Sequence, residues 1–363
     1  MNKDKISVII PAYQPDEKLL TTIQSLIASG FSDILVINDG SREETATLFA
    51  EAEAFPQCTV LHHPENRGKG AALKTAFQFF LENRPDRLCA VTADADGQHL
   101  TKDIEAVSLT ALKEEKIVLG TRDFSDPNVP ARSKTGNQIT VFVFRLFFGM
   151  KIRDTQTGLR AFPRKYIQAL TEIKGDRYEY ETNQLFFINR NGFPLEQVNI
   201  STVYIDENKS SHFRVIRDSV RIYGLILKYL CSSVAASVID ALAFYILKKI
   251  AVLAFLPIPL TFSSAFIARA ISSIINFFMN AKLVFGGNAN KQTLLKYYTL
   301  AVAQIGISAV LVFITEGLLK IWSPALSTLV KIIIDTVLFF FSFRIQHKWV
   351  FNNKNTVGKE SVQ

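Results

Sequence analysis

Two aspartates separated by one residue, Asp94 and Asp96, directly follow an apolar stretch over residues 88–92. Carboxylate oxygens are preferred ligands of hard divalent cations, and such a cation can bridge the phosphates of a diphosphate. Gln98 supplies a further oxygen two positions later. Because acidic pairs also occur in solvated turns, a metal site requires that neighbouring segments suit a phosphate-bearing ligand. On that condition, the spacing predicts a Mg²⁺ or Mn²⁺ ion held by Asp94, Asp96 and Gln98.

The elements that must position these residues are short apolar runs alternating with longer amphipathic stretches over the first 125 residues. This pattern is typical of an α/β fold with a mostly parallel sheet covered by helices. The expected strands are Ile6–Ile10, Ile34–Ile37, Thr59–His62, Leu88–Thr92 and Ile117–Gly120. In open α/β sheets, ligands bind outside the carboxyl ends of the strands. Four polar segments should therefore face one crevice: Pro11–Tyr13, Asn38–Ser41, Asp94–Gln98 and Thr121–Arg122.

Two segments at expected strand ends add to the pattern. They read Ser-Val-Ile-Ile-Pro-Ala-Tyr over residues 7–13 and Val-Ile-Asn-Asp-Gly-Ser over residues 36–41. Together with the Asp-Ala-Asp segment, they resemble family 2 glycosyltransferases of the GT-A fold. The resemblance implies a nucleotide diphosphate sugar donor, either a UDP-sugar or GDP-mannose, with Asp39 contacting the base. Asn38 stands where the family often has another aspartate, and Asp39 could instead cap a turn with Ser41. The donor contacts implied are Pro11, Ala12, Tyr13, Ile37, Asp39, Asp94, Ala95 and Asp96.

Basic residues at three places could bind the donor diphosphate. Residues 66–70 read Asn-Arg-Gly-Lys-Gly and precede an expected helix, whose N-terminus favours anions. A plain turn with two solvated charges would explain Arg67 and Lys69 equally well. Residues 209–217 resemble the basic loop of the family that closes over the donor phosphates, although attraction to a membrane surface explains them too. The expected donor-side cations are Lys69, Arg122, Lys209, Arg214 and Arg217.

Residues 154–162 read Asp-Thr-Gln-Thr-Gly-Leu-Arg-Ala-Phe and match the Asp-x-x-x-Gly-x-Arg segment of the polyprenyl phosphate branch, which includes dolichyl phosphate mannose synthases. The resemblance implies a lipid phosphate acceptor. A phosphate with a second pKa of about 6 is already a competent nucleophile, so a strong base is dispensable. We expect Asp154 to act as base or positioner, and Arg160 to support this segment or bind phosphate; a structural Asp154–Arg160 pair is the alternative. Glu179 or Glu181 could bind sugar hydroxyls.

The charge balance divides the chain near Arg221. Residues 1–221 carry 28 Lys and Arg against 29 Asp and Glu, whereas residues 222–363 carry 13 against 4. In the second part the cations flank long apolar runs, which indicates a membrane rather than a nucleic acid partner. Three scattered cysteines form no disulfide framework and fit a reducing compartment. No signal peptide is recognised, so we expect the first domain, residues 1–221, to stay in the cytoplasm.

An all-α transmembrane domain is expected over residues 222–352, followed by a polar tail over residues 353–363. Positive charges crowd the same ends of the apolar runs, which places both termini in the cytoplasm of a multi-pass cell-membrane protein. Amphipathic segments near residues 136–150 and 210–223 should lie in the membrane interface, with a buried core helix as the alternative for the first. The four expected spans are residues 225–247, 260–279, 297–319 and 325–343.

The membrane part also repeats itself. Asn-Ala-Lys-Leu-Val-Phe over residues 280–285 and Gln-His-Lys-Trp-Val-Phe over residues 346–351 share their Lys, Val and Phe positions. Two helical hairpins of the same orientation would produce this repeat, and chance is the alternative. Charges inside an apolar span are costly, so we expect a polar seam within the bundle with Arg269 facing Asp240 or Asp335. The charges concerned are Asp240, Arg269, Glu316, Lys331 and Asp335.

The four spans resemble the GtrA-like membrane domain, whose role could be anchoring or the movement of a lipid-linked sugar; it could also support a homo-oligomer. Together the two resemblances imply a metal-dependent, inverting transfer of a sugar to polyprenyl (undecaprenyl) phosphate for modification of a cell-envelope glycan. A translocator of lipid-linked sugar is the alternative from another class. A transferase with another acceptor is the nearer one, although its usual Gln-x-x-Arg-Trp segment does not occur in this sequence.

Overall fold

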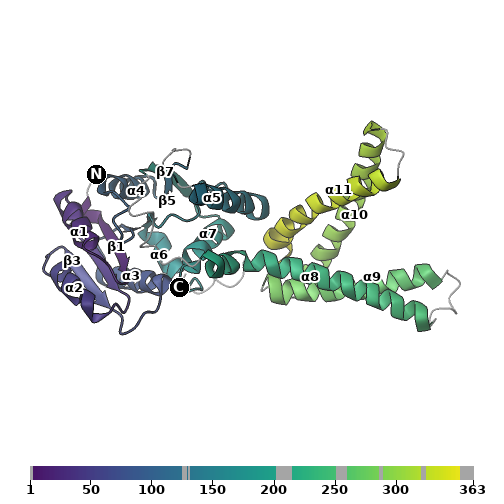
Figure 1. Ribbon diagram of the computed structural model, residues 1–363, viewed down its shortest axis with the longest axis horizontal. Coiled ribbons are helices and arrows are strands. Elements are labelled where there is room, and N and C mark those ends of the chain that lie inside the picture. Colours follow the sequence, from purple (N-terminus) through teal and green to yellow (C-terminus); the bar gives the residue numbers. More distant parts are fainter. Residues whose placement is uncertain are drawn as a thin grey trace. The chain divides into compact units, whose positions relative to one another are not determined.

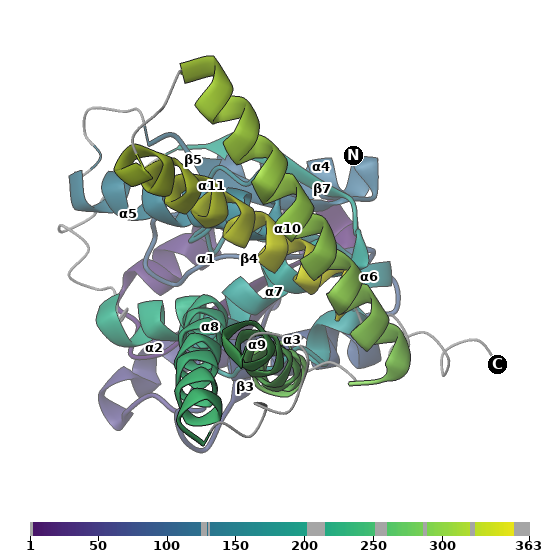
Figure 2. The same ribbon diagram turned by 90° about the vertical axis from the view of Figure 1, so that its right-hand side faces the viewer.

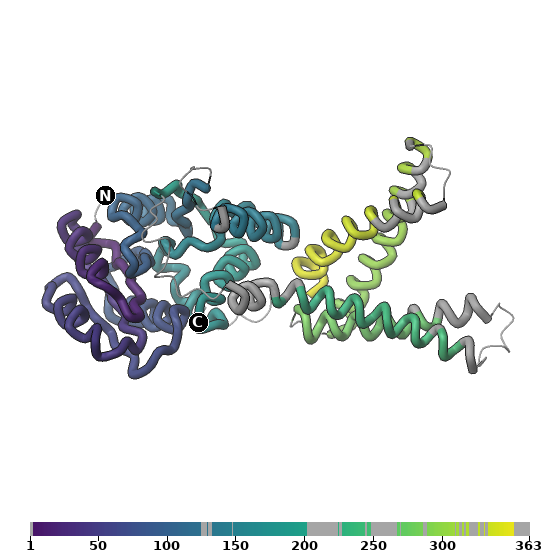
Figure 3. Tube along the Cα trace, in the orientation of Figure 1, coloured from purple at the N-terminus to yellow at the C-terminus, as the bar shows by residue number. Residues whose placement is uncertain are grey.

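The computed structural model describes residues 3–124, 129, 131–201, 215–250, 260–285, 289–319 and 324–351 (Figure 3). Contacts between Cα atoms group the chain into two compact units, Met1–Arg221 and Ile222–Gln363.

The first unit is built on a seven-stranded sheet with the order β3-β2-β1-β4-β6-β5-β7 (Figure 1). Its strands are β1 (Ile6–Ala12), β2 (Ile34–Asn38), β3 (Cys58–His62), β4 (Cys89–Thr92), β5 (Ile117–Arg122), β6 (Arg160–Pro163) and β7 (Leu195–Ile200). All five expected strands are therefore present, and two more follow them. Strand β6 alone runs antiparallel, between β4 and β5. Its first residue, Arg160, consequently pairs with Thr92 at the carboxyl end of β4 and with Leu119 in the middle of β5.

Helices cover both faces of this sheet (Figure 1). Successive side chains of a strand point to opposite faces, so a run such as Ile9-Ile10 contributes to two cores. Ile10 packs in the cluster that includes α1 and α4, whereas Ile9 packs in the cluster that includes α3, α6 and α7. Burial on both faces explains why the strands read as continuous apolar runs. The helices are α1 (Lys18–Ala28), α2 (Ala46–Glu53), α3 (Lys69–Asn83), α4 (Thr101–Glu114), α5 (Ala131–Val143), α6 (Arg164–Thr171) and α7 (Glu179–Asn191).

Helix α5 falls in the region expected to be an interfacial amphipathic segment. Asn137 and Thr140 are buried on one side of it, whereas Ile139 and Phe142 are more than half exposed. A π-helical turn, Phe144–Phe148, continues the helix and buries both of its terminal phenylalanines. The helix thus combines a buried face with exposed apolar side chains, and its position in a membrane interface stays a prediction.

In its described residues the second unit contains four long helices, α8 (Val215–Ile250, which begins before the unit's first residue), α9 (Leu260–Met279), α10 (Lys291–Leu319) and α11 (Pro324–Ile345). Helix α8 lies beside α9, and α10 beside α11 (Figures 1 and 2). Within the described residues, the segment Leu227–Leu247 is long and apolar enough to cross a membrane, and Ala270–Val284 is a shorter apolar segment.

The two copies of the internal repeat meet in this unit. Helices α9 and α11 each continue into a π-helical turn, Asn280–Val284 and Gln346–Val350. The first residues of the two turns bond to each other, with Asn280 Nδ2 donating to Gln346 Oε1 at 3.2 Å. The phenylalanines that end the repeats, Phe285 and Phe351, stack with ring centroids 5.2 Å apart. The short sequence match therefore corresponds to two like segments that pack against each other.

Polar side chains inside this unit have partners on neighbouring helices. Ser272 donates to Asp240 at 3.0 Å, and Ser308 donates to Asp335 at 2.5 Å. The two aspartates thus face a neighbouring helix, as the cost of a lipid-facing charge requires. The expected pairing with Arg269 stays a prediction, because three of the side chains named for the seam lie outside the described part of the structure: Arg269, Glu316 and Lys331.

Candidate active site

The donor-side segments lie next to one another because their strands are neighbours in the sheet. Pro11 pairs with Ile37 and Ala12 with Asn38, while Ile9 pairs with Thr92 on the other side of β1. The residues after β2, β1 and β4 consequently share one rim. Tyr13 is exposed there, whereas Ile37 is fully buried, so its predicted contact with the donor stays a prediction. Ala95 is partly buried and packs against the core.

The Asp94–Gln98 loop forms a tight turn directly after β4. The Gln98 amide donates to Asp96 Oδ1 at 3.0 Å, and Gly97 adopts a left-handed φ of 75° that favours glycine. The Asp94 amide donates to Nδ1 of His99 at 3.0 Å. These bonds fix the backbone, so both carboxylates are held at the rim and only partly buried.

Lys69 contacts two acidic side chains at once, Asp94 and Glu181. Its ammonium lies 2.7 Å from Asp94 Oδ1 and 3.0 Å from Glu181 Oε1. Burial opposes ionisation of Asp94, but the charge and hydrogen bond of Lys69 together with the charges of His99 and Arg122 outweigh it and lower the pKa of Asp94 to about 2. Burial, reinforced by the charge of Asp94, raises the pKa of Asp96. The charge of Asp94 is thus neutralised by Lys69, whereas no cation stabilises the charge of Asp96 to a comparable extent.

This arrangement fits a divalent cation that is shared with a substrate. The donors on Asp94, Asp96 and Gln98 are all oxygens, the ligand type of Mg²⁺ and Mn²⁺. In the described part of the chain, no group of three or more His, Cys, Asp or Glu side chains could hold a metal ion unaided. Mg²⁺ is commonly bound by one or two carboxylates plus substrate phosphates, so a two-carboxylate site suits an ion that arrives with a diphosphate.

Gly158 approaches the Asp94 carboxylate so closely that a side chain cannot fit. A Cβ atom built at Gly158 would lie 2.9 Å from Asp94 Cγ. We therefore expect Gly158→Ala to displace this carboxylate and to raise the Mn²⁺ concentration for half-maximal activity on the order of tenfold, as changes around metal ligands do. The control is Gly136→Ala, where nothing lies within 4 Å. An unchanged metal requirement in Gly158→Ala would contradict this role for the close approach.

Asp39 organises the loop that precedes α3. Its carboxylate is 2% exposed and accepts hydrogen bonds from the amides of Arg67 and Gly68 at 3.0 and 2.7 Å. His63 Nδ1 lies 2.7 Å from the same carboxylate. Asn38, not Asp39, makes the turn contact with Ser41, by accepting from its amide at 2.9 Å. The contact of Asp39 with a nucleotide base stays a prediction.

The partner of Asp154 is Arg122, not Arg160. Arg122 Nε and Nη2 lie 2.7 and 3.1 Å from the two oxygens of Asp154, whose side chain is fully buried. The Gln156 amide donates to Asp154 at 3.0 Å as well. This bidentate geometry corrects the alternative of an Asp154–Arg160 pair. Because Arg122 occupies both oxygens of Asp154, this geometry favours a role for Asp154 in positioning Arg122 over a role as a base.

Arg160 is a buried structural anchor of this segment. It is 1% exposed and donates to the carbonyl oxygens of Thr157 and Glu181 at 2.9 and 2.6 Å. Gln184 Oε1 accepts a third bond at 3.0 Å. Burial lowers the pKa of the guanidinium. Of the two expected roles, support of the segment and phosphate binding, this environment favours support.

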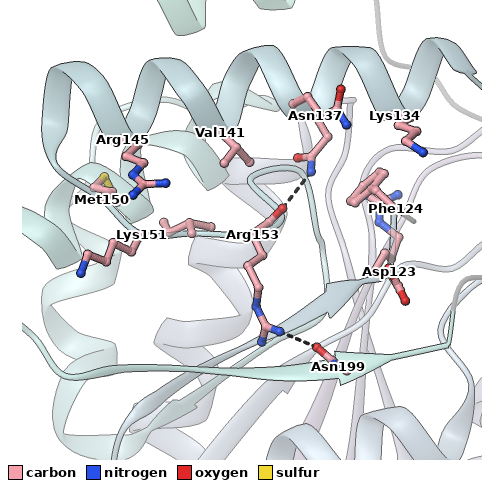
Figure 4. Close-up of a pocket in the computed structure, with 13 residues that line it drawn as sticks. Asp123, Phe124, Lys134, Asn137, Val141, Arg145, Met150, Lys151, Arg153 and Asn199 are labelled. Atoms are coloured by element: carbon pink, nitrogen blue, oxygen red, sulfur yellow. Dashed lines mark hydrogen bonds between the residues drawn. The ribbon is translucent and has the colours of Figure 1, made fainter. Parts of the chain in front are cut away.

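A basic and apolar cavity of about 760 Å³ lies beside Arg122. Helix α5 presents Lys134 and Val141 to it, and the π-helical turn that continues α5 presents Arg145 (Figure 4). Arg153 crosses the centre, where its guanidinium donates to Asn199 at 2.8 Å. The cavity's cations are Arg122, Lys134, Arg145, Lys151 and Arg153, and its apolar lining is Phe124, Val141, Met150 and Ile152. Five cations among apolar side chains suit an anionic headgroup joined to a hydrocarbon chain.

Two groups of basic residues differ between the sequence-based expectation and the structure: the cations of the cavity and those of the predicted donor loop. The cations of the cavity other than Arg122 were not singled out; their only signal was the excess of 11 Lys and Arg over 5 Asp and Glu between residues 122 and 177. The predicted donor-loop cations Lys209 and Arg214, and the side chain of Arg217, lie outside the described residues.

Comparison with known proteins identifies both parts of the chain. Residues 7–193 match the model of glycosyl transferase family 2, and residues 228–351 match that of the GtrA/DPMS transmembrane domain. The uncharacterized protein MJ1222 of Methanocaldococcus jannaschii is 32% identical over 63% of this chain and 93% of its own length.

Two further relatives have named activities. The UDP-N-acetylglucosamine–dolichyl-phosphate N-acetylglucosaminyltransferase of Methanococcus voltae is 28% identical, over 61% of this chain and 95% of its own. The dolichyl-phosphate beta-glucosyltransferase of Dictyostelium discoideum is also 28% identical, over 60% of this chain and 73% of its own.

Proposed function

Because the chain belongs to glycosyl transferase family 2 and carries a GtrA/DPMS transmembrane domain, we propose that this membrane glycosyltransferase moves a sugar from a nucleotide diphosphate to a polyprenyl phosphate. The observation that carries the acceptor assignment is the cavity beside Arg122, which combines cations with apolar side chains. Dolichyl phosphate is the acceptor in the names of two relatives, which supports the same class of acceptor. Catalysis belongs to residues 1–221 at the cytoplasmic face, and residues 222–352 hold the enzyme in the membrane.

On the donor side, the rim formed by Pro11–Tyr13, Asp39 and Ala95 receives the nucleotide. A divalent cation held by Asp94, Asp96 and Gln98 would neutralise the charge that develops on the leaving diphosphate. Glu181 lies 3.0 Å from Lys69 at the same site, and we assign it to the sugar hydroxyls. Exclusion of water and orientation of the anomeric carbon are the tasks of these side chains.

Arg122, which the sequence analysis placed among the donor-side cations, lines the cavity instead and in this proposal binds the lipid phosphate on the acceptor side, while Asp154 holds its guanidinium in place. An oxygen of the ionised phosphate attacks the anomeric carbon on the face opposite the nucleotide, and the bond from that carbon to the diphosphate oxygen breaks with its electron pair. Because a phosphate with a pKa of about 6 is already ionised, no side chain has to remove a proton. A single displacement of this kind inverts the anomeric configuration.

The test is an assay of the full-length protein in detergent with a panel of nucleotide sugars and short polyprenyl phosphates. We expect one donor class to yield a polyprenyl monophosphate sugar with inverted configuration, identified by mass spectrometry and NMR. Transfer to a glycan but not to the lipid phosphate would instead support the other-acceptor alternative. Absence of transfer, together with movement of lipid-linked sugar across reconstituted vesicles, would support the translocator.

The cavity makes a specific prediction about the acceptor. Arg145 lines the cavity from the π-helical turn that follows α5 and has no part in the Asp94 site. We expect Arg145→Gln to raise the KM for polyprenyl phosphate about fivefold, since a cation near an anionic lipid contributes about 1 kcal/mol, while the donor Kd stays unchanged. Lys113→Gln, an exposed lysine on α4, is the control and should leave both constants alone. A higher donor Kd with an unchanged acceptor KM would assign the cavity to the donor.

A further inference from the structure

Lys69 is held in place by the packing of the backbone on both sides of it. Gly68 has a φ of 102°, and a Cβ there would lie 2.7 Å from Arg177 Cγ. A Cβ at Gly70 would lie 2.5 Å from Tyr180 Cβ. The start of α3 is therefore pressed against the segment that leads into α7, and α7 carries Glu181. This contact fixes the distance from the Lys69 backbone to Glu181, one of its two carboxylate partners.

Lys69 already neutralises part of the negative charge of the site. Its ammonium is 17% exposed and contacts Asp94 and Glu181 together. Asp96 is the second carboxylate of the loop, two residues after Asp94 and like it only partly buried. A divalent cation on Asp94 and Asp96 would share Asp94 with the ammonium, and two cations on one carboxylate repel each other.

We propose that Lys69 is a built-in counter-ion of the metal site, which leaves Asp94 when a divalent cation binds and then contacts the donor diphosphate. This inference rests on the metal assignment of the proposed function. Glu181 keeps one contact with the ammonium during the exchange. The cation alone must displace Lys69 and gains little, whereas a cation arriving with a diphosphate supplies a new anionic partner for the lysine. Cation and nucleotide therefore strengthen each other's binding, and this coupling is reciprocal.

The experiment measures Mn²⁺ binding by electron paramagnetic resonance on full-length protein in detergent, without nucleotide and with UDP or GDP. In Lys69→Met we expect Mn²⁺ alone to bind tighter than in wild type, on the order of tenfold, and UDP or GDP to tighten Mn²⁺ binding less than it does in wild type. The matched control is Lys74→Met, because Lys74 also lies on α3 and pairs with a carboxylate, Asp176, at 2.9 Å. That variant should behave as wild type.

A measurement on the wild-type protein covers the case in which Lys69→Met does not fold. Acetylation of Lys69, followed by mass spectrometry and normalised to Lys74, should rise when Mn²⁺ is added and fall again when UDP or GDP joins it. The counter-ion role is overturned if folded Lys69→Met binds Mn²⁺ no more tightly than wild type, or if acetylation of Lys69 does not change when Mn²⁺ is added. Either result leaves the metal assignment itself standing. Wild-type protein that binds no Mn²⁺ even with either nucleotide would overturn the metal assignment and this inference with it.

Discussion

Asp96→Asn should abolish sugar transfer, lowering the rate by at least about a hundredfold, since a cation that offsets charge on a leaving group is worth several kcal/mol. The amide keeps the shape of the side chain but cannot supply the negative charge that holds the ion. The turn itself should survive, because the amide oxygen can still accept the bond from the Gln98 backbone. Initial rates over a series of Mg²⁺ and Mn²⁺ concentrations measure the effect, and the variant should no longer respond to added metal.

The control for this prediction is Asp86→Asn, an exposed aspartate between α3 and β4. It should keep the wild-type rate and metal response. Asp94→Asn should also lower the rate, and its effect includes the loss of the Lys69 partner. Wild-type turnover by Asp96→Asn, or full activity of the parent protein in excess chelator, would show that transfer does not depend on a metal at this site.

Asp154→Asn should lower both the transfer rate and the stability of the first unit while leaving donor affinity nearly unchanged. Removing one partner of a buried ion pair costs about 3 kcal/mol, and Asp154 is fully buried against the Arg122 fork. A misplaced Arg122 should slow transfer on the order of a hundredfold, the effect of poor positioning at a reacting centre. Thermal unfolding, initial rates and calorimetric titration with the nucleotide separate the three quantities.

Arg122→Lys distinguishes a positioning role of Asp154 from that of a base. Lysine keeps the charge but not the planar fork that matches a carboxylate. If Asp154 acts through Arg122, Arg122→Lys should lose much of the rate that Asp154→Asn loses. If Asp154 instead removes a proton, Arg122→Lys should raise the KM for polyprenyl phosphate, because Arg122 binds that phosphate, but should retain most of kcat. Loss of nucleotide affinity in Asp154→Asn as severe as the loss of rate would move Asp154 to the donor side.

The sequence by itself determined the family, the α/β class of the first part and the helical membrane domain of the second, and the comparisons confirm all three. It also located the five strands β1 to β5. These features follow from local patterns: apolar runs form buried strands, and polar residues at their carboxyl ends must meet at one rim. The position of the Asp94–Gln98 loop follows from the strand that precedes it.

Only the tertiary structure decided which side chains pair across the site. Asp154 and Arg122 are 32 residues apart, and Lys69 reaches Glu181 from another helix. These partners depend on the insertion of β6 between β4 and β5 and on the contact of α3 with α7, which are packing choices between distant segments. Strand β6 has only four residues, Arg160 to Pro163, and its buried arginine hides the apolar pattern of a strand. The charge of Arg160 is tolerated because the carbonyl oxygens of Thr157 and Glu181 accept its hydrogen bonds. Glu181 belongs to helix α7, and no local sequence pattern encodes a hydrogen bond to it.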